Sequence, residues 1–172
     1  MSTIEIQFAT TEILQMLNTA IAALGNVEPA MQDIGRYMLR QTAMRFEREQ
    51  DPDGKRWANL HPQRWAQKDN KKILTENGEL RGSINYRTTG SSVTIGTIKP
   101  YAAILQLGGQ TRAHLIRPKT KKALAWPGCG HPVKEVKHPG SKFPPRPFLG
   151  VGGQDEQEIM LIISNFMTVF GK

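Results

Sequence analysis

The stretch that decides the fold lies in the middle of the chain, between residues 46 and 109. Residues 46–57 read FEREQDPDGKRW, residues 73–84 read ILTENGELRGSI, residues 93–97 read VTIGT, and residues 101–109 read YAAILQLGG. The Asp-Pro-Asp-Gly sequence inside the first piece predicts a turn, because each of these residue types favours turn geometry. The stretch combines turn signals with a compact apolar cluster and has no evident catalytic constellation. We therefore interpret it as the folded centre of an assembly protein.

This central stretch also predicts a hairpin and a short helix. Over residues 83–98, apolar and polar side chains alternate on both sides of a Thr-Gly-Ser connector, which is typical of an antiparallel hairpin. Residues 101–107 are too uniformly apolar for a half-exposed strand, so we expect a short buried helix that Gly108 ends. We expect eight residues in the core or in subunit contacts: Tyr101, Ile104, Leu105, Ile84, Val93, Ile95, Leu149 and Phe148.

Upstream of the centre, the pattern changes from a strand to two helices. Residues 4–8 alternate as in a strand, and the apolar residues from Ile13 to Leu24 recur at helical spacing, with Thr10 as a plausible N-cap and Gly25 as a stop. A second helix is expected over about 27–49, with Asn26 able to cap it. Its apolar stripe consists of Val27, Met31, Ile34, Met38 and Phe46. The charged residues of its last part predict a solvated end: Arg40, Arg45, Glu47, Arg48 and Glu49.

Downstream of the centre, residues 112–148 form a basic, proline-rich region. Short strands are expected near Leu115 and Ala125, on either side of a basic turn at 119–122, and residues 128–142 resemble a long loop. The last helix is expected over 155–170, and it is apolar on more than one side, which suggests burial by this chain or by a neighbour. Five residues are candidates for subunit contact: Ile159, Ile163, Phe166, Phe170 and Phe148.

The order of these elements predicts an α+β fold. We expect one domain over residues 1–172, in which the strand near Ile4, the hairpin and the strands near Leu115 and Ala125 form a mostly antiparallel sheet. The N-terminal helices and the C-terminal helix are expected to pack on this sheet. The basic Pro/Gly-rich loop at about 112–148 is expected to extend from it.

Length and composition limit the classes of function. The chain has 172 residues, of which 38% are hydrophobic and 22% charged, and its one cysteine rules out an intramolecular disulfide. No apolar run reaches the roughly 20 residues that span a bilayer, and we see no secretory signal. The formal net charge of +8 favours acidic partners such as nucleic acid.

Four groups of residues are candidates for catalytic, metal or phosphate sites. Zinc binding by His114, Cys129, His131 and His138 lacks the paired ligand spacing of structural sites, and a Cys129–histidine nucleophile pair has no orienting third group. Asp51, Asp53, Glu76 and Glu79 could pair for acid–base or metal chemistry, but the turn sequence explains Asp51 and Asp53 without catalysis. The glycines Gly150, Gly152 and Gly153 precede a helix, but acidic residues follow them and would repel phosphate. We therefore expect no enzyme activity, no metal and no cofactor.

The basic region remains a candidate for contact with DNA. Such contact would be to phosphates without base reading, so it would weaken with salt and be indifferent to sequence. A solvated basic surface explains the same residues equally well. The candidates for phosphate contact are Arg112, Arg117, Lys119, Lys121 and Lys122.

The ordered set of motifs resembles the virion morphogenesis, or tail-completion, family of tailed bacteriophages, which Mu-like phages carry. The resemblance rests on four pieces over about residues 46–150: Asp-Pro-Asp-Gly-Lys-Arg-Trp, Gly-Glu-Leu-Arg-Gly-Ser-Ile, Pro-Tyr-Ala-Ala-Ile, and the closing Pro-Pro-Arg-Pro-Phe-Leu-Gly. The chain departs from the family pattern at Leu105, where a histidine is common, and at Pro145, where a small residue is common.

The resemblance implies a structural virion protein without catalysis. Such proteins act at the neck, complete or terminate the tail, and make it competent to join the head-side connector. They form closed rings, commonly of six subunits, so the implied partners are other copies of the chain, the tail tube and neck proteins, and packaged DNA, with no membrane. The implied location is the virion, after assembly in the host cytoplasm. The alternative is a basic DNA-binding accessory protein without catalytic activity.

Overall fold

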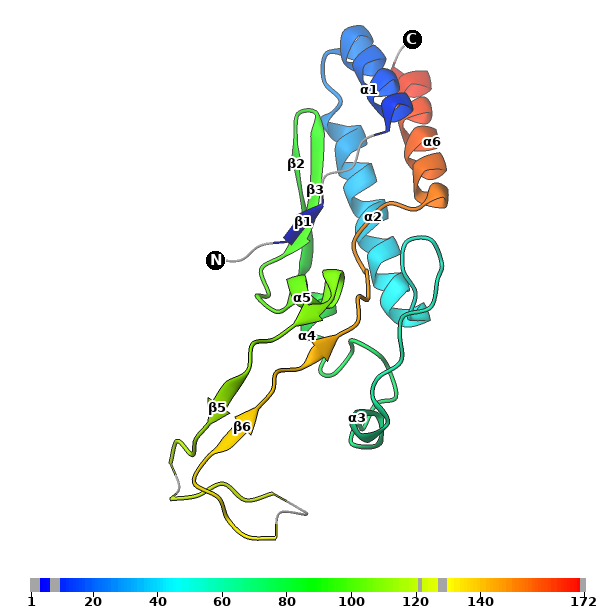
Figure 1. Cartoon of the computed structure of the whole chain (residues 1–172). Helices are drawn as coiled ribbons and strands as arrows, with labels where there is room; N and C mark the ends of the chain where they lie inside the picture. The colour runs from blue at the N-terminus through cyan, green and yellow to red at the C-terminus, as the bar shows by residue number, and fades with distance from the viewer. Residues whose placement is uncertain (1–3, 7–9, 121, 127–129, 171–172) are drawn as a thin grey trace.

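The computed structural model describes residues 4–6, 10–120, 122–126 and 130–170 of the chain (Figure 1). The elements follow one another in this order: β1 (Ile4–Ile6), α1 (Thr11–Leu24), α2 (Glu28–Arg48), α3 (Pro62–Ala66), α4 (Glu79–Gly82), β2 (Ile84–Thr89), β3 (Ser92–Thr97), α5 (Ala102–Leu107), β4 (Gly109–Gln110), β5 (His114–Ile116), β6 (Val136–His138), β7 (Lys142–Phe143) and α6 (Gly153–Phe170). The α+β class predicted from the sequence is confirmed. Among the described helices, none is both long and apolar enough to cross a membrane.

The two N-terminal helices begin and end close to the expected signals. The Thr10 side chain accepts a hydrogen bond from the amide of Ile13, and Gly25 ends α1 with a positive φ of 71°. Before α2, the Asn26 side chain accepts a bond of 3.0 Å from the amide of Glu28, although Val27 holds the N-cap position itself. The strand over residues 4–6 is also present, whereas the rest of the predicted strand, to Phe8, lies outside the described residues.

The central helix α2 buries its predicted stripe, but one prediction about its last part is wrong. Val27, Met31, Ile34, Met38 and Phe46 are all buried. Arg45 was expected in solvent with its charged neighbours, and it is only 5% exposed. It falls on the buried face because it lies seven residues, or two helical turns, after Met38.

One antiparallel sheet covers α2, and it has only three strands, in the order β1-β3-β2 (Figure 1). The β2–β3 hairpin confirms the expectation for residues 83–98, and Ile84 and Ile95 point into the core. The ring of Tyr86 lies against Gly35 of α2, where a Cβ would be only 2.2 Å from a ring carbon. A glycine that is unfavourable in an isolated helix therefore permits close packing of helix on sheet. Helices α1 and α6 pack together at the far end of α2.

The strands near Leu115 and Ala125 do not join this sheet, which corrects the prediction. Leu115 lies in β5, which pairs with β6. Strand β6 lies within residues 128–142, where the sequence predicts a loop. Beyond β5 and β6, the described residues of this ladder form one isolated bridge, between Leu124 and Val133. Pro118 has no amide hydrogen to donate to a ladder, which disfavours the expected pairing across the basic turn. Residues 109–143 instead form a long two-stranded arm that leaves the rest of the molecule, here called the body (Figure 1). That the arm and the body form a single domain stays a prediction.

The core contains half of the eight expected residues. Ile84, Ile95, Phe148 and Leu149 are buried, Val93, Ile104 and Leu105 are half-buried, and Tyr101 is 42% exposed. Helix α5 exists as predicted but is not a buried helix, because only Ala102 and the polar Gln106 are buried in it. Its apolar residue Leu107 is 75% exposed.

Gly152 provides a test of how tightly the segment before α6 crosses the 51–54 turn. A Cβ at Gly152 would lie 2.1 Å from the carbonyl oxygen of Pro52, whereas a Cβ at Gly153 would meet no atom within 4 Å. We expect Gly152→Ala to lower the free energy of unfolding by about 1–3 kcal/mol, because backbone must move. Gly153→Ala should leave it nearly unchanged. Urea denaturation of both variants measures the difference, and equal stability would contradict the close crossing.

Candidate functional site

The arm is held to the body at its base by Arg146. Its guanidinium Nε donates to the carbonyl oxygen of Ala58 at 2.7 Å, and its second terminal nitrogen donates to that of Asn59 at 3.0 Å. The side chain is buried, and this burial lowers the pKa of the guanidinium. Arg146 lies three residues after the end of β7, so these bonds fix the point at which the returning strand of the arm re-enters the body.

Gln106 and Trp57 hold the next three residues of the same segment. Its Oε1 accepts hydrogen bonds from the amides of Phe148 and Leu149, at 2.9 and 3.0 Å, and its Nε2 donates to the carbonyl oxygen of Leu149 at 2.8 Å. The indole nitrogen of Trp57 donates to the carbonyl oxygen of Pro147 at 2.8 Å. The ring of Phe148 then packs on Phe46, with centroids 5.4 Å apart. The closing sequence motif is therefore bonded and packed inside the fold and does not form an exposed site.

A buried ion pair links the closing motif to α2 and to the start of α6. A terminal nitrogen of Arg45 lies 2.5 Å from the Oδ2 atom of Asp155, and both side chains are almost fully buried. Arg45 also donates to the carbonyl oxygens of Phe148 and Gly150. Asp155 Oδ2 accepts from the amide of Gly152 at 2.8 Å. A single network thus joins α2, the closing motif and the first turn of α6.

Tyr37 extends this network from α2. Its hydroxyl donates to Asp155 Oδ1 at 3.1 Å. Burial raises the pKa of Tyr37 to about 12, and the nearby carboxylate of Asp155 adds to this shift because it disfavours tyrosinate. Burial lowers the pKa of Arg45, whereas Asp155 opposes that change. The contact with Asp155 and the bonds to two backbone carbonyls therefore offset part of the cost of burying the Arg45 guanidinium.

The sequence signals for these polar residues were only partly visible. Arg45 continues the spacing of the α2 stripe through Met38 and Thr42, so the helical period could have identified it. Asp155 was expected only as a favourable charge at a helix N-terminus. Gln106 and Arg146 carry no local signal of burial, because their partners lie more than 40 residues away in the chain.

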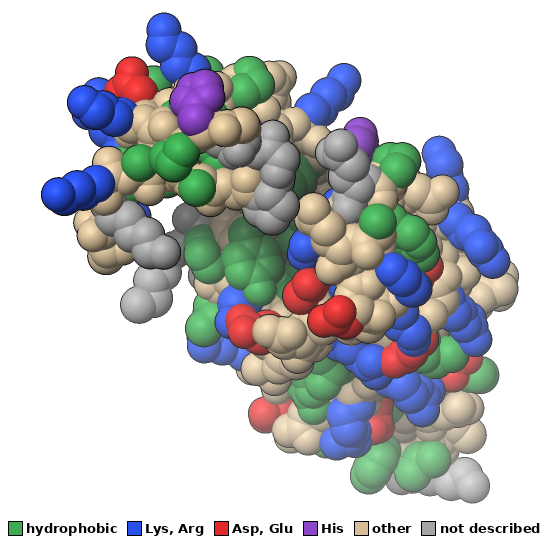
Figure 2. All heavy atoms as spheres, turned by 90° about the horizontal axis from the view of Figure 1, so that it is seen from below, with side chains coloured by type: hydrophobic (Ala, Val, Ile, Leu, Met, Phe, Trp, Pro, Cys, Tyr) green, Lys and Arg blue, Asp and Glu red, His purple; other side chains and the backbone are tan. Residues whose placement is uncertain are grey.

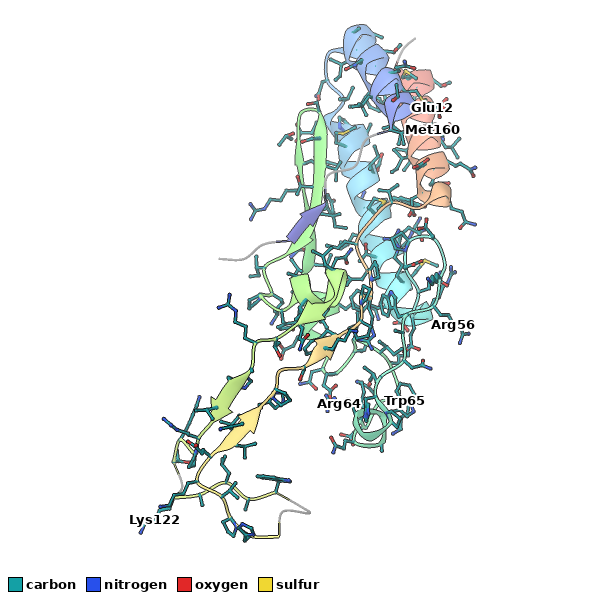
Figure 3. All side chains as sticks on the ribbon, viewed as in Figure 1. Glu12, Arg56, Arg64, Trp65, Lys122 and Met160 are labelled. Carbon is teal, nitrogen blue, oxygen red and sulfur yellow. The ribbon has the colours of Figure 1, made fainter. Side chains whose placement is uncertain are left out.

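The arm presents basic side chains to solvent. Its two strands are joined at the inner end by the β4–β7 pair and by Thr111 and Ser141, since the Thr111 amide donates to the Ser141 carbonyl oxygen and the Ser141 amide donates to the Thr111 hydroxyl. His114 and His138 face each other across β5 and β6, with ring centroids 5.1 Å apart. Lys122 lies at the far end of the arm, at the opposite end of the molecule from Glu12 of α1 and Met160 of α6 (Figure 3).

The structure brings most of the proposed phosphate contacts together on this arm. Arg112, Arg117, Lys119 and Lys122 are all exposed, and Lys121 lies outside the described residues. Arg117 forms an ion pair of 3.1 Å with Glu135. Seen from below, lysine and arginine side chains project from the end of the molecule that carries the arm (Figure 2). A groove of about 870 Å³ lies beside the arm base, between α3 and the segment that contains Phe143.

The candidates for subunit contact separate into two groups. Phe148, Ile159 and Ile163 lie in the core of their own chain. Phe166 is half-buried and Phe170 is 60% exposed, with their rings 4.9 Å apart at the end of α6. Only this second pair remains available to a neighbouring molecule. A groove of about 540 Å³ runs beside it, between α6 and α2.

The residues weighed for chemistry have structural roles where they are described. Asp51 Oδ1 accepts from the amides of Asp53 and Lys55 and so fixes the 51–54 turn. Glu76 pairs with Arg64 and Lys68, and Glu79 pairs with Lys99. In the described part of the chain, no group of three or more His, Cys, Asp or Glu is arranged to hold a metal ion, and Cys129 lies outside that part.

Comparison with known proteins identifies the family. A search of curated proteins and a search of solved structures each found no match. Residues 8–168 match the model of the phage virion morphogenesis family, which covers nearly the whole chain, including α1, the arm and most of α6. The match agrees with the resemblance carried by the motifs of residues 46–150. The chain therefore belongs to the phage virion morphogenesis family.

Proposed function

We propose that the protein completes the tail of a tailed phage and joins it to the head as a homo-oligomeric ring at the neck. Membership of the family supports a structural role in the virion. The ring, the neck location and the count of six subunits are proposals that go beyond family membership. We propose no catalytic role.

The observation that carries the ring is a pair of unlike apolar surfaces on one chain. The first, which we call the helix-end surface, consists of Leu14 of α1 and Leu161, Val169 and Phe170 of α6, each 49–66% exposed. The second, which we call the α5 surface, consists of Ile98, Tyr101 and Leu107, each 42–75% exposed. The two surfaces lie apart, since α5 is beside the arm base and α1 and α6 form the other end (Figure 1).

Two different surfaces suit a ring better than a symmetric dimer. In a dimer with two-fold symmetry the same surface occurs on both sides of the interface, whereas a closed ring joins one surface to a different one on the next subunit. Exposed apolar patches commonly mark protein–protein contacts when they are contiguous. A ring in which the helix-end surface of one subunit meets the α5 surface of the next would cover both.

Variants of the two surfaces test this arrangement. We expect Leu161→Asp/Val169→Asp to remove the helix-end contact and Leu107→Asp to remove the α5 contact, so each variant alone should be monomeric by native mass spectrometry. An equimolar mixture should form a 1:1 dimer and no ring, because only one intact pair of surfaces remains. The matched control Gln157→Asp/Ser164→Asp adds the same charge to exposed polar positions of α6 and should still form rings. A Leu107→Asp protein that dimerises alone would contradict the head-to-tail arrangement.

Electron microscopy of particles tests the location. Particles made without the protein should contain separate heads and tails, and the wild-type protein should appear at the junction as a ring. Normal joining of heads and tails in its absence would remove the neck assignment. DNA binding by a soluble monomer, with no density in the particle, would favour the alternative of a DNA-binding accessory protein, which the basic arm makes the second candidate.

A further inference from the structure

The positive charge of the protein is concentrated on the arm. Residues 109–143 contain eight of the 23 lysines and arginines but one of the 15 acidic residues, Glu135, so they carry seven of the eight net positive charges. The remainder of the chain is close to neutral, with 15 basic and 14 acidic residues. The seven described basic side chains of the arm are all exposed: Arg112, Arg117, Lys119, Lys122, Lys134, Lys137 and Lys142.

We propose that the arm binds duplex DNA through its phosphates, with contacts from the tip and from both strands of the ribbon. This deepens the proposed function and rests on it, since the neck is where packaged DNA would meet the arm. The site extends beyond the candidates on the outgoing side of the arm, because Lys134 and Lys137 come from the returning side. Lys137 lies directly opposite Leu115 in the β5–β6 register.

The near-neutral charge of the body favours DNA over a second copy of the body as the ligand. Five of the 14 acidic side chains of the body are also paired with basic residues of their own chain: Asp33 with Arg36, Glu47 with Lys72 and Arg81, Glu76 with Arg64 and Lys68, Glu79 with Lys99, and Asp155 with Arg45. Among the described lysines and arginines of the arm, Arg117 is the one with a carboxylate partner, Glu135. A neutral body offers the arm little attraction, whereas duplex DNA has one negative charge per about 1.7 Å of its axis.

The shape of the arm also fits this ligand. All three residues of β5 are exposed, so both faces of the ribbon are open to solvent. A two-stranded antiparallel ribbon is narrow enough to enter the major groove of B-DNA. The bonds between Thr111 and Ser141 join the two strands at the inner end of the arm, and Arg146 holds that end on the body, so the basic tip is directed outward. Leu115, Ile116 and Trp126 are also exposed on the arm, which makes a protein surface the alternative ligand to be tested.

Paired charge-reversal variants separate the position of the charge from its amount. The arm variant is Lys119→Glu/Lys122→Glu/Lys134→Glu, and the body control is Lys55→Glu/Arg56→Glu/Arg87→Glu. All six residues are exposed, and the structure gives none of them an ion pair among the described residues. Both variants change the net charge equally. Binding is measured by fluorescence anisotropy with a labelled duplex of mixed sequence, between about 50 and 200 mM salt.

We expect the arm variant to bind at least about tenfold more weakly at the lower salt. The slope of log affinity against log salt should fall by about three, roughly one for each phosphate contact removed. The body control should bind within about twofold of the wild-type protein, since its changes lie away from the contact. Circular dichroism melts check that both variants fold, and cross-linking of wild-type protein to bromodeoxyuridine-containing duplex should label peptides within residues 109–143.

Three results would overturn the proposal: no binding by the wild-type protein at low salt, equal loss in the two variants, or cross-links confined to the body. An arm variant that keeps its affinity for DNA but no longer forms rings would instead assign the arm to a neighbouring subunit. Ring formation is measured separately by native mass spectrometry. If the protein forms rings but does not bind DNA, the DNA-binding proposal fails and the proposed ring stands. If it binds DNA through the arm but forms no rings, the proposed ring fails and the DNA-binding proposal stands.

Discussion

Replacement of Asp155 by alanine should lower the free energy of unfolding by about 3–5 kcal/mol, because it leaves the buried guanidinium of Arg45 without its carboxylate. The pair is held at 2.5 Å, with both side chains less than 10% exposed. The same change removes the acceptor of the Gly152 amide and of the Tyr37 hydroxyl. The loss of several bonds inside the fold makes this one of the two most destabilising single changes that we expect. Chemical denaturation followed by tryptophan fluorescence measures it.

Two further variants separate the buried pair from charge loss in general. Asp33→Ala removes the carboxylate of an exposed pair with Arg36 on the same helix α2, and it should leave the stability unchanged within error, as is usual for surface pairs. Arg45→Met/Asp155→Ala removes both buried charges, and it should be more stable than Asp155→Ala alone. If the double variant is the less stable of the two, the cost lies in lost packing instead of an unpaired charge.

The features that the sequence predicted are those that short-range patterns determine. Thr10 and Gly25 mark the ends of α1 because a cap acts on amides and carbonyls within one turn. The β2–β3 hairpin follows from alternation on both sides of a short connector, and the α2 stripe follows from the helical period. None of these features requires knowledge of what the element packs against.

The features that the sequence did not predict depend on partners far away in the chain. Nothing near Leu115 indicates that its strand will pair with residues 136–138 instead of 123–126. Local sequence likewise does not distinguish Arg45 from the other charged residues at this end of α2, and only the fold brings it to Asp155, 110 residues away. Tyr101 and Leu107 look like core residues by hydropathy, yet they remain exposed on α5.

The sequence predicted the basic residues of the candidate site but not the projecting ribbon that carries them. The basic residues between 112 and 122 were identified from composition, but their placement on a projecting ribbon was not. The returning side, with Lys134 and Lys137, adds charge to the same ribbon because β6 pairs with β5. In contrast, the candidates at Phe148, Ile159 and Ile163 follow the apolar pattern correctly but lie in the core, because periodicity does not distinguish a core from an interface.

Phe148→Ala should lower the free energy of unfolding by about 3–5 kcal/mol, the usual range for a buried phenylalanine. Its side chain is completely buried, and its ring contacts that of Phe46, which in turn packs edge-on against Trp57. Removal of the ring would leave a cavity where the closing motif meets α2. The surrounding backbone has little freedom to fill that cavity, because the Gln106 side chain is hydrogen-bonded to both the amide and the carbonyl oxygen of Leu149.

Phe170→Ala is the matched change at the surface, and it should act on assembly instead of folding. Phe170 is 60% exposed at the end of α6, so its truncation should change the unfolding free energy of the isolated chain by less than about 0.5 kcal/mol. If the helix-end surface contacts a neighbour, the same variant should shift the distribution in native mass spectra from rings to monomers, whereas Phe148→Ala should lower the yield of folded chain. A Phe170→Ala protein that unfolds as readily as Phe148→Ala would show that α6 is covered by its own chain, and one that forms rings as well as the wild type would exclude this residue from the interface.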